Sequence, residues 1–321
     1  MAVTSADRIV VTTVTENYVD MLLADAPRVT RAGLAHHFDP KRQNPVAENG
    51  VAFHVRIEWG RYVYQVLFDT GMSSRTLLHN AGALGIDLAA LDHIVISHGH
   101  PDHYGGLIGL LSSFPAEVPV SLGAAAFLPR YLRLASGQVA PYYNQDFTLE
   151  RIASAGGRPV THDDALEVGP GAIATGSIPR SVDFEMASDR IDTANALIQV
   201  VNGRMVPDSV PDDQAMVINL GKDGIVVFVG CSHAGIVNTL KRAVEITGRS
   251  RILGVFGGMH LGFPGTPDSK TTKTIDIFKS MNIELLCPMH CTGMDAMMKI
   301  KAAFPEEFLL NCTGTKVELE A

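Results

Sequence analysis

The sequence predicts a layered α/β protein in which helices cover mixed β-sheets. Two observations favour this class. Short runs rich in β-branched and aromatic residues recur along the 321-residue chain, and the first of them are separated by turn residues. Later runs of the same kind alternate with segments of helical period, in both halves of the chain. Hairpins make antiparallel pairs and helical crossovers make parallel pairs, so we expect mixed sheets.

The N-terminal half contributes the first expected elements. The stretch "EWGR" joins two β-rich runs and is typical of a hairpin turn. A helix is expected over 73–84, and another begins at His103. The expected strands are residues 8–14, 50–59, 61–70 and 93–97.

The C-terminal half repeats this arrangement. The expected strands there are 214–221, 223–230, 251–258 and 283–290, and the expected helices are 235–247, 269–281 and 294–304. Between the halves, residues from about 123 to 212 are less regular. Irregular stretches between core elements more often form lids or substrate loops than linkers. We therefore expect a single domain over 1–321, with a lid or substrate region at about 123–212.

Composition and charge exclude several classes of function. The net charge of -8 and the pI near 5.8 do not fit a nucleic-acid partner, which requires a clustered basic face. No apolar stretch approaches the roughly 18 residues that span a bilayer, and the N-terminus lacks the features of a secretory signal. The four cysteines form no paired framework, so we expect reduced thiols and a cytoplasmic protein. We expect a small-molecule substrate, and the residues leave a homo-oligomer open.

The stretch "SHGHPDH" is the strongest functional signal in the chain. It follows the apolar run "HIVI" and places four potential metal ligands in six positions. His98 and His100 are two apart at a strand end, so both imidazoles point to the same side and can reach one ion. Pro101 turns the chain into a helix, and Asp102 and His103 then reach the same cavity from another direction, where they could hold a second ion. Imidazole and carboxylate are ligands of zinc and related first-row ions.

Three later histidines have a similar setting. In "FVGCSHAGI", "FGGMHLG" and "LCPMHCTG", an apolar strand is followed by a small residue or proline and then by histidine. These histidines are His233, His260 and His290. Ligands at strand ends are held by rigid elements while loops remain free for substrate, so we expect all three at one site. Cys231, two residues before His233, either approaches the ions or is a buried small side chain.

These motifs together resemble the metallo-β-lactamase superfamily. The motif HxHxDH follows a strand, "LFDTG" precedes it, and strand-end histidines come later. The stretches "LGIDLAALDHIVISHGHPDHYGGL", "IPRSVDFE", "DDQAMVINL", "GCSHAGIVNTL" and "HCTG" are similar to the branch of dihydropterin–ribofuranosylaminobenzene-phosphate synthase-like hydrolases. The resemblance covers nearly the whole chain. It implies a four-layer αββα sandwich, in which two mixed β-sheets are flanked by helices and a metal centre lies along one edge of the sheets.

The resemblance also implies two sets of metal ligands. The set for the first ion is His98, His100 and His233, and the set for the second is Asp102, His103 and His290. Asp69 would contact a ligand or the strand-end loop, rather than the ion itself, and so fix its orientation. We expect one or two zinc ions, with Mn²⁺ or Fe²⁺ as alternatives.

Two positions depart from the family pattern. Many two-metal members carry a bridging aspartate between the third and last histidines, and His260 stands about there. One imidazole lone pair cannot bridge two ions as a carboxylate can. The second ion is then bound more weakly, absent or held by other groups. His260 is free to face substrate and to act in catalysis. Asn49 stands where the branch usually has histidine, which replaces a proton donor by a neutral amide.

The implied chemistry is hydrolysis of an ester, lactone, amide or phosphodiester in a small, anionic metabolite. A bound metal ion makes water a nucleophile near neutral pH, and Asp102 would act as base or orient that water. Arg180 in "SIPR" would bind a carboxylate or phosphate of the substrate through its guanidinium. Alternatively, Arg180 pairs with Glu185 and is structural.

Three other functions stay open. An iron-dependent oxidoreductase or dioxygenase could use the same scaffold, although His100 argues against the diiron electron-transfer version, which usually has glutamate there. A pterin-related synthase is implied by the branch, and Asn49 argues against it. A non-catalytic metal-binding module would not require the complete ligand set.

Overall fold

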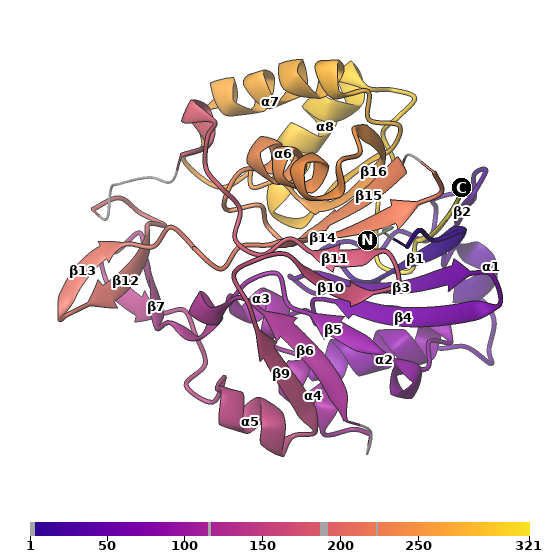
Figure 1. The fold of residues 1–321 in the computed structure, drawn as a ribbon, viewed down its shortest axis with the longest axis horizontal. Coiled ribbons are helices and arrows are strands. Elements are labelled where there is room, and N and C mark those ends of the chain that lie inside the picture. The colour runs from indigo at the N-terminus through magenta and orange to yellow at the C-terminus, as the bar shows by residue number, and fades with distance from the viewer. Residues whose placement is uncertain (1–3, 115–116, 187–191, 223) are drawn as a thin grey trace.

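Two mixed β-sheets pack face to face in the computed structural model, and helices cover the outer face of each sheet (Figure 1). The structure describes residues 4–114, 117–186, 192–222 and 224–321. The order of layers is helix, sheet, sheet, helix. The predicted four-layer αββα sandwich is therefore confirmed.

The first sheet combines an antiparallel part with a parallel part. Its strands in spatial order are β2 (Val29–Thr30), β18 (Lys316–Glu320), β1 (Arg8–Thr15), β3 (Ala52–Trp59), β4 (Tyr62–Phe68), β5 (His93–Val95), β6 (Val118–Leu122) and β9 (Gly157–Thr161). The expected hairpin at "EWGR" joins β3 to β4, and Gly60 at its tip has a φ of 55°, a conformation that glycine adopts without steric cost. From β4 to β9 the neighbouring strands run parallel.

The second sheet repeats this change of direction. Its strands in spatial order are β10 (Leu166–Gly169), β11 (Ala172–Ala174), β14 (Ala215–Leu220), β15 (Gly224–Val229), β16 (Arg251–Gly258) and β17 (Leu286–Met289). The first four pair antiparallel, whereas β15, β16 and β17 run parallel. Each sheet therefore has a parallel part, and the carboxyl ends of neighbouring parallel strands meet at one edge.

Helices fill the two outer layers. They are α1 (Leu34–His37), α2 (Ser74–Leu84), α3 (Pro101–Tyr104), α4 (Leu107–Leu111), α5 (Leu149–Ser154), α6 (Ile236–Thr247), α7 (Asp268–Met281) and α8 (Met294–Ala303). The expected helix at 73–84 is α2, whose Ser73 side chain accepts a hydrogen bond from the Thr76 backbone and caps the first turn. Within the described residues, no helix has both the length and the apolar character needed to cross a bilayer.

The region at about 123–212 is more regular than the sequence suggested. Much of it forms a small third sheet, which projects from the sandwich (Figure 1). Its strands in spatial order are β13 (Arg204–Pro207), β12 (Leu197–Val201), β7 (Arg130–Arg133) and β8 (Val139–Pro141). Residues 187–191 of this region lie outside the described residues.

The expectation of irregular structure in these strands was wrong because they are short and half exposed, which weakens the alternation of apolar and polar residues. One signal was available in the sequence. Asn202 and Gly203 both have positive φ in the turn between β12 and β13, and Asn-Gly is the strongest short hairpin signal.

The main apolar core lies between the two large sheets. Phe53 of β3 is fully buried there, and its ring lies 6.5, 5.8 and 6.2 Å from the rings of Phe68, Phe228 and Phe256. These four rings come from both sheets, so their contacts join the inner layers. The two outer cores lie between each sheet and its helices.

Candidate metal centre

The histidines singled out in the sequence come from loops at the carboxyl ends of parallel strands. His98, His100 and His103 follow β5 of the first sheet. His233 and His290 follow β15 and β17 of the second sheet. Because the two sheets pack face to face, their strand-end loops meet at one edge of the sandwich. The site is therefore built from both sheets.

The first predicted ligand set is brought together in the structure. Ligand atoms of His98, His100 and His233 all lie within 4.8 Å of one another. Burial lowers the pKa of all three imidazoles well below the ordinary value, so each ring is neutral and keeps a lone pair. Nε2 of His100 and Nε2 of His233 have no hydrogen-bond partner among the described residues. Two buried nitrogens without partners fit a cation, because neutral imidazole is a common metal ligand.

The second predicted set also converges. Ligand atoms of Asp102, His103 and His290 lie within 4.8 Å of one another. Burial opposes ionisation of Asp102, but His103 and His290 outweigh it and hold the pKa of the carboxyl well below its usual range. The His290 Nε2 lies 3.3 Å from Oδ2 of this carboxylate. The set thus offers one anionic oxygen and two imidazoles, which suits a divalent ion.

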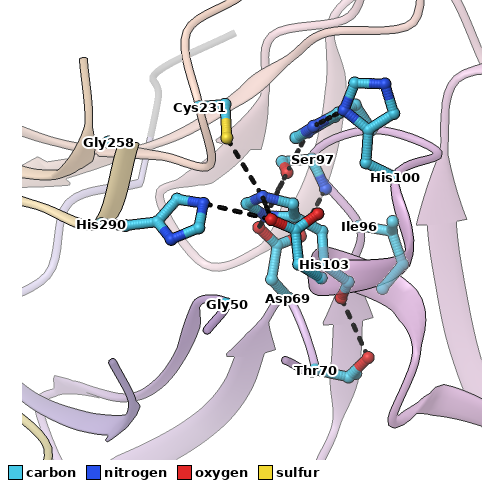
Figure 2. Close-up of polar contacts among 12 residues, drawn as sticks. Gly50, Asp69, Thr70, Ile96, Ser97, His100, His103, Cys231, Gly258 and His290 are labelled. Carbon is cyan, nitrogen blue, oxygen red and sulfur yellow. Dashed lines mark hydrogen bonds and ion pairs between the residues drawn. The ribbon is translucent and has the colours of Figure 1, made fainter. Parts of the chain in front are cut away.

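Asp69 lies behind the ligands and fixes one of them. Its carboxylate accepts hydrogen bonds of 2.7 Å from the backbone N–H and the hydroxyl of Ser97, and its Oδ2 lies 2.7 Å from Nδ1 of His103 (Figure 2). The Asp69 carboxylate can only accept, so Nδ1 of His103 carries a proton and Nε2 is the ring nitrogen that faces the site. This position supports the predicted orienting role.

Gly99 allows the close packing of the ligand loop. A Cβ atom there would overlap the backbone carbonyl of Ala126 and the guanidinium of Arg130. The Gly99 backbone N–H also donates a 2.7 Å hydrogen bond to the buried carboxylate of Asp212. A side chain between the two histidines would therefore displace the loop, which explains the glycine in "HGH".

Comparison with known proteins identifies the family. A sequence model of the metallo-beta-lactamase superfamily matches residues 64–290, a range that includes every predicted ligand. The chain belongs to the metallo-beta-lactamase superfamily.

This superfamily member is similar to two proteins over most of its length. It is 30% identical over 262 residues to 7,8-dihydropterin-6-methyl-4-(beta-D-ribofuranosyl)-aminobenzene-5'-phosphate synthase of Methanocaldococcus jannaschii, with 82% of this chain and 87% of the relative covered. The crystal structure of a metal-dependent hydrolase of the beta-lactamase superfamily matches with a TM-score of 0.70 and 25% identity, and the match covers 98% of this chain and 100% of that chain. The resemblance inferred from the motifs, including its branch, is thus confirmed.

The metallo-beta-lactamase site of this chain contains polar residues that the sequence did not single out. The Tyr142 hydroxyl donates a 3.2 Å hydrogen bond to Oδ1 of Asp102, and its ring lies 5.0 Å from the ring of His100. Asn17 places its Oδ1 3.2 Å from Nδ1 of His290. Neither residue belongs to a strand-end motif, and each is close to the site only because of the tertiary fold.

The two departures from the family pattern both lie at this site. Asn49 donates a 3.4 Å hydrogen bond from Nδ2 to Oδ2 of Asp102, so the amide contacts a predicted ligand directly. His260 lies with its ring centre 4.4 Å from that of His233 and stacks on Phe263. Its Nδ1 has no hydrogen-bond partner among the described residues.

Arg180 contacts the protein backbone in this superfamily member. Its Nη1 donates a 2.6 Å hydrogen bond to the carbonyl of His233, and its Nη2 donates to the carbonyl of Ser209. The carboxylate of Glu185 accepts instead from the backbone N–H groups of Val237 and Asn238 at the start of α6. The guanidinium thus supports the His233 loop, and its contacts do not suggest an anchor for substrate.

Two cavities meet at the site. The inner cavity has a volume of about 300 Å³ and is lined by His100, Asp102, His233, His260 and His290 among others. A second cavity of about 540 Å³ shares His233, His260 and Phe263 with the first and extends away from it. We call this second space the outer chamber.

Proposed function

We propose that the protein is a metal-dependent hydrolase of a small anionic metabolite with an ester, lactone or phosphodiester bond. The main support for this proposal is that two groups of three potential ligand atoms converge at one cavity at the edge of the sandwich. Family membership supports the proposal, since the matched crystal structure is described as a metal-dependent hydrolase. Zinc suits these nitrogen and oxygen donors best, and manganese or iron could replace it.

When bound, a divalent ion at such a site acts as a Lewis acid and lowers the pKa of water. The residues of the chain supply the rest. Asp102, kept ionised by His103 and His290, can accept a proton or orient the attacking water. Tyr142 and Asn49 donate hydrogen bonds to the Asp102 carboxylate and restrict its orientation.

His260 is the residue that we propose exchanges a proton with the substrate in the inner cavity. It lines both cavities, and its Nδ1 has no partner within the described part of the chain. Stacking on Phe263 fixes the plane of the ring. An imidazole fixed in this way can exchange a proton with a leaving group.

Lys270 supports the choice of an anionic substrate. It lines the outer chamber and lies in the first turn of α7, where the helix dipole already favours an anion. No hydrogen bond or ion pair of its ammonium group is found among the described residues, whereas Glu185 and Asp208 in the same chamber are both engaged. A carboxylate or phosphate of the substrate would satisfy this ammonium group.

The Lys270→Met variant tests the substrate class. We expect it to raise KM by roughly 10- to 100-fold, because one charge-assisted contact is worth roughly 1.5–3 kcal/mol, and to leave metal content unchanged. The control is Lys279→Met, at the other end of α7, where the lysine pairs with Asp276. An equal KM in the two variants would show that Lys270 does not bind substrate.

A pterin-related synthase is the second candidate function. It is favoured by the 30% identity to the synthase of Methanocaldococcus jannaschii, which extends over 82% of this chain. Asn49, at the position where that branch usually has histidine, contacts Asp102 and alters the polar groups of the inner cavity. Assays with a pterin substrate beside ester, lactone and phosphodiester panels would distinguish the two candidates.

Metal analysis of the purified protein tests the proposal as a whole. We expect one or two zinc or manganese ions per chain, and hydrolysis that stops on chelation. His98→Ala should lose metal and activity while keeping its circular dichroism spectrum, and His79→Ala, whose imidazole contacts the Asn44 carbonyl away from the site, should lose neither. Full metal content in the His98 variant would refute the ligand assignment. A single iron would favour the oxidoreductase.

A further inference from the structure

We propose that Cys231 provides a thiolate ligand shared by both ion positions. The inference rests on the metal-dependent function proposed above and adds a sulfur donor to a site of nitrogen and oxygen ligands. It also addresses the absence of the bridging carboxylate that many two-metal members of the superfamily carry.

The position of the Cys231 sulfur carries the inference. Sγ belongs to three of the five groups of converging ligand atoms found within the described residues. In these groups it lies within 4.8 Å of a ring nitrogen of His98, His103, His233, His260 and His290, and of the Cys291 sulfur. His98 and His233 belong to the first ligand set, and His103 and His290 belong to the second. The sulfur thus lies close to ligand atoms of both predicted sets.

The fold fixes this position tightly. Cys231 is 4% exposed and follows β15 after Gly230, and Ser232 after it has a φ of 57°. On the other side, a Cβ atom at Gly258 would overlap Cys291 Sγ and lie 3.4 Å from the Cys231 Cα. In Figure 2, Cys231 and His290 both point toward the centre where His103 lies. A larger side chain at Gly258 would therefore push these groups out of place.

The local hydrogen bonds leave lone pairs that need a cation. His103 donates from Nδ1 to Asp69, so Nε2, 3.2 Å from Cys231 Sγ, is the ring nitrogen left for a metal ion. His100 and His233 each add a buried nitrogen with no partner within the described ranges. One thiol proton cannot satisfy all of these acceptors. A cation can, and the thiolate is the form of cysteine that binds it.

The chemistry of sulfur suits a shared ligand. An imidazole nitrogen has one lone pair in the ring plane and binds one ion, whereas a thiolate sulfur has several lone pairs and can bind two. On binding, the Cys231 S–H bond breaks, the electron pair stays on sulfur, and the proton passes to solvent. Cys231 then provides the anionic bridge that the missing carboxylate supplies elsewhere, and His260 remains free for substrate.

Cobalt substitution tests the inference without an activity assay. The full-length protein is stripped with a chelator and titrated with Co²⁺ alone, and the absorption spectrum is followed. A thiolate bound to Co²⁺ gives a sulfur-to-metal charge-transfer band in the near ultraviolet that histidine and carboxylate ligands do not give. We expect this band in the wild type and in Cys291→Ser, and its loss in Cys231→Ser.

A second measurement protects the test against a variant that fails to fold. In the wild type, alkylation of Cys231 followed by mass spectrometry should be slower with Co²⁺ than in the stripped protein, while alkylation of Cys312 should not change. Cobalt binding without the band would overturn the inference and leave the proposed function standing. A band lost only in Cys291→Ser would assign the sulfur to Cys291. No cobalt binding at all would refute both proposals.

Discussion

At the scale of single residues, the polar contacts of Asp102 decide how the site is organised. Its two carboxylate oxygens lie near the Tyr142 hydroxyl, the Asn49 amide and the His290 ring. These partners come from three separate segments of the chain. The direction of the Asp102 side chain is therefore set by long-range contacts rather than by the local motif.

Tyr142→Phe should weaken the site without disturbing the fold. The change removes the 3.2 Å hydrogen bond to Asp102 and leaves the ring in place. Loss of a hydrogen bond behind a metal ligand typically costs 10–100-fold in metal affinity or activity, and we expect a loss in that range. Metal titration and kcat measure it. Tyr143→Phe is the matched control, because Tyr143 contacts Tyr131 and not the site. Equal losses in the two variants would contradict this role.

The sequence indicated the residues that converge at the candidate metal centre, but not the polar residues around them. The spacing of the histidines after an apolar run indicates metal chemistry, because few other functions require so many ligands in six positions. Tyr142 and Asn17 could not be predicted, since a tyrosine or asparagine in a loop has no distinctive pattern. Arg180 shows the opposite case. Its residue type suggested an anion site, but the fold uses its donors on backbone carbonyls.

At the scale of secondary structure, β5 carries the ligand loop and lies between β4 and β6. His93 begins this strand and is 7% exposed, with Nε2 2.7 Å from the Ser121 hydroxyl of β6. Burial, reinforced by Arg158 and His162, lowers the pKa of His93 from its ordinary 6.5 to about 4. Protonation of this imidazole therefore costs stability in the folded protein.

His93 contributes to the pH dependence of stability. As the pH falls below 6.5, the unfolded chain binds a proton at this ring while the folded chain does not until about pH 4. Stability is therefore lost between these values, by at most about 3 kcal/mol from this group. His93→Gln should flatten this part of the curve in urea unfolding at several pH values, and the exposed His37→Gln should not. An unchanged slope in His93→Gln would exclude His93 as the source.

The sequence predicted helices and strands correctly where apolar residues recur with a clear period. The hairpin of β3 and β4 and the helices α2, α6, α7 and α8 agree with the sequence. Of these helices, α2 also has an N-terminal cap, the side chain of Ser73. The third sheet was not expected, because its strands of three to five residues have one exposed face. Short half-exposed strands give too few residues for the period to be visible.

At the scale of the whole molecule, the contact between the two sheets holds the site together. The four-layer arrangement followed from the resemblance and not from residue spacing, because the spacing specifies elements but not the order of strands. Phe53 joins the sheets through three aromatic neighbours. Any loosening of this core would separate the loops that carry the two ligand sets.

Phe53→Ala should lower the free energy of unfolding by about 3–5 kcal/mol, since it leaves a cavity in a fully buried core. Urea unfolding of the stripped and the metal-loaded protein measures this change. Metal affinity should fall as well. Phe38→Ala, at a residue that is 71% exposed, is the control and should change stability little. A loss in Phe53→Ala as small as in the control would contradict the assigned role of this core.

The division of the ligands between the two sheets also affects how the protein is made. A ribosome synthesises the loop after β5 long before the loops after β15 and β17, so a growing chain first exposes only the histidines from 98 to 103. Three nearby histidines and an aspartate can bind a metal ion weakly before the rest of the site exists. An ion bound at that stage would lack the proposed ligands of the second sheet, and it would exchange readily until His233 and His290 have been added.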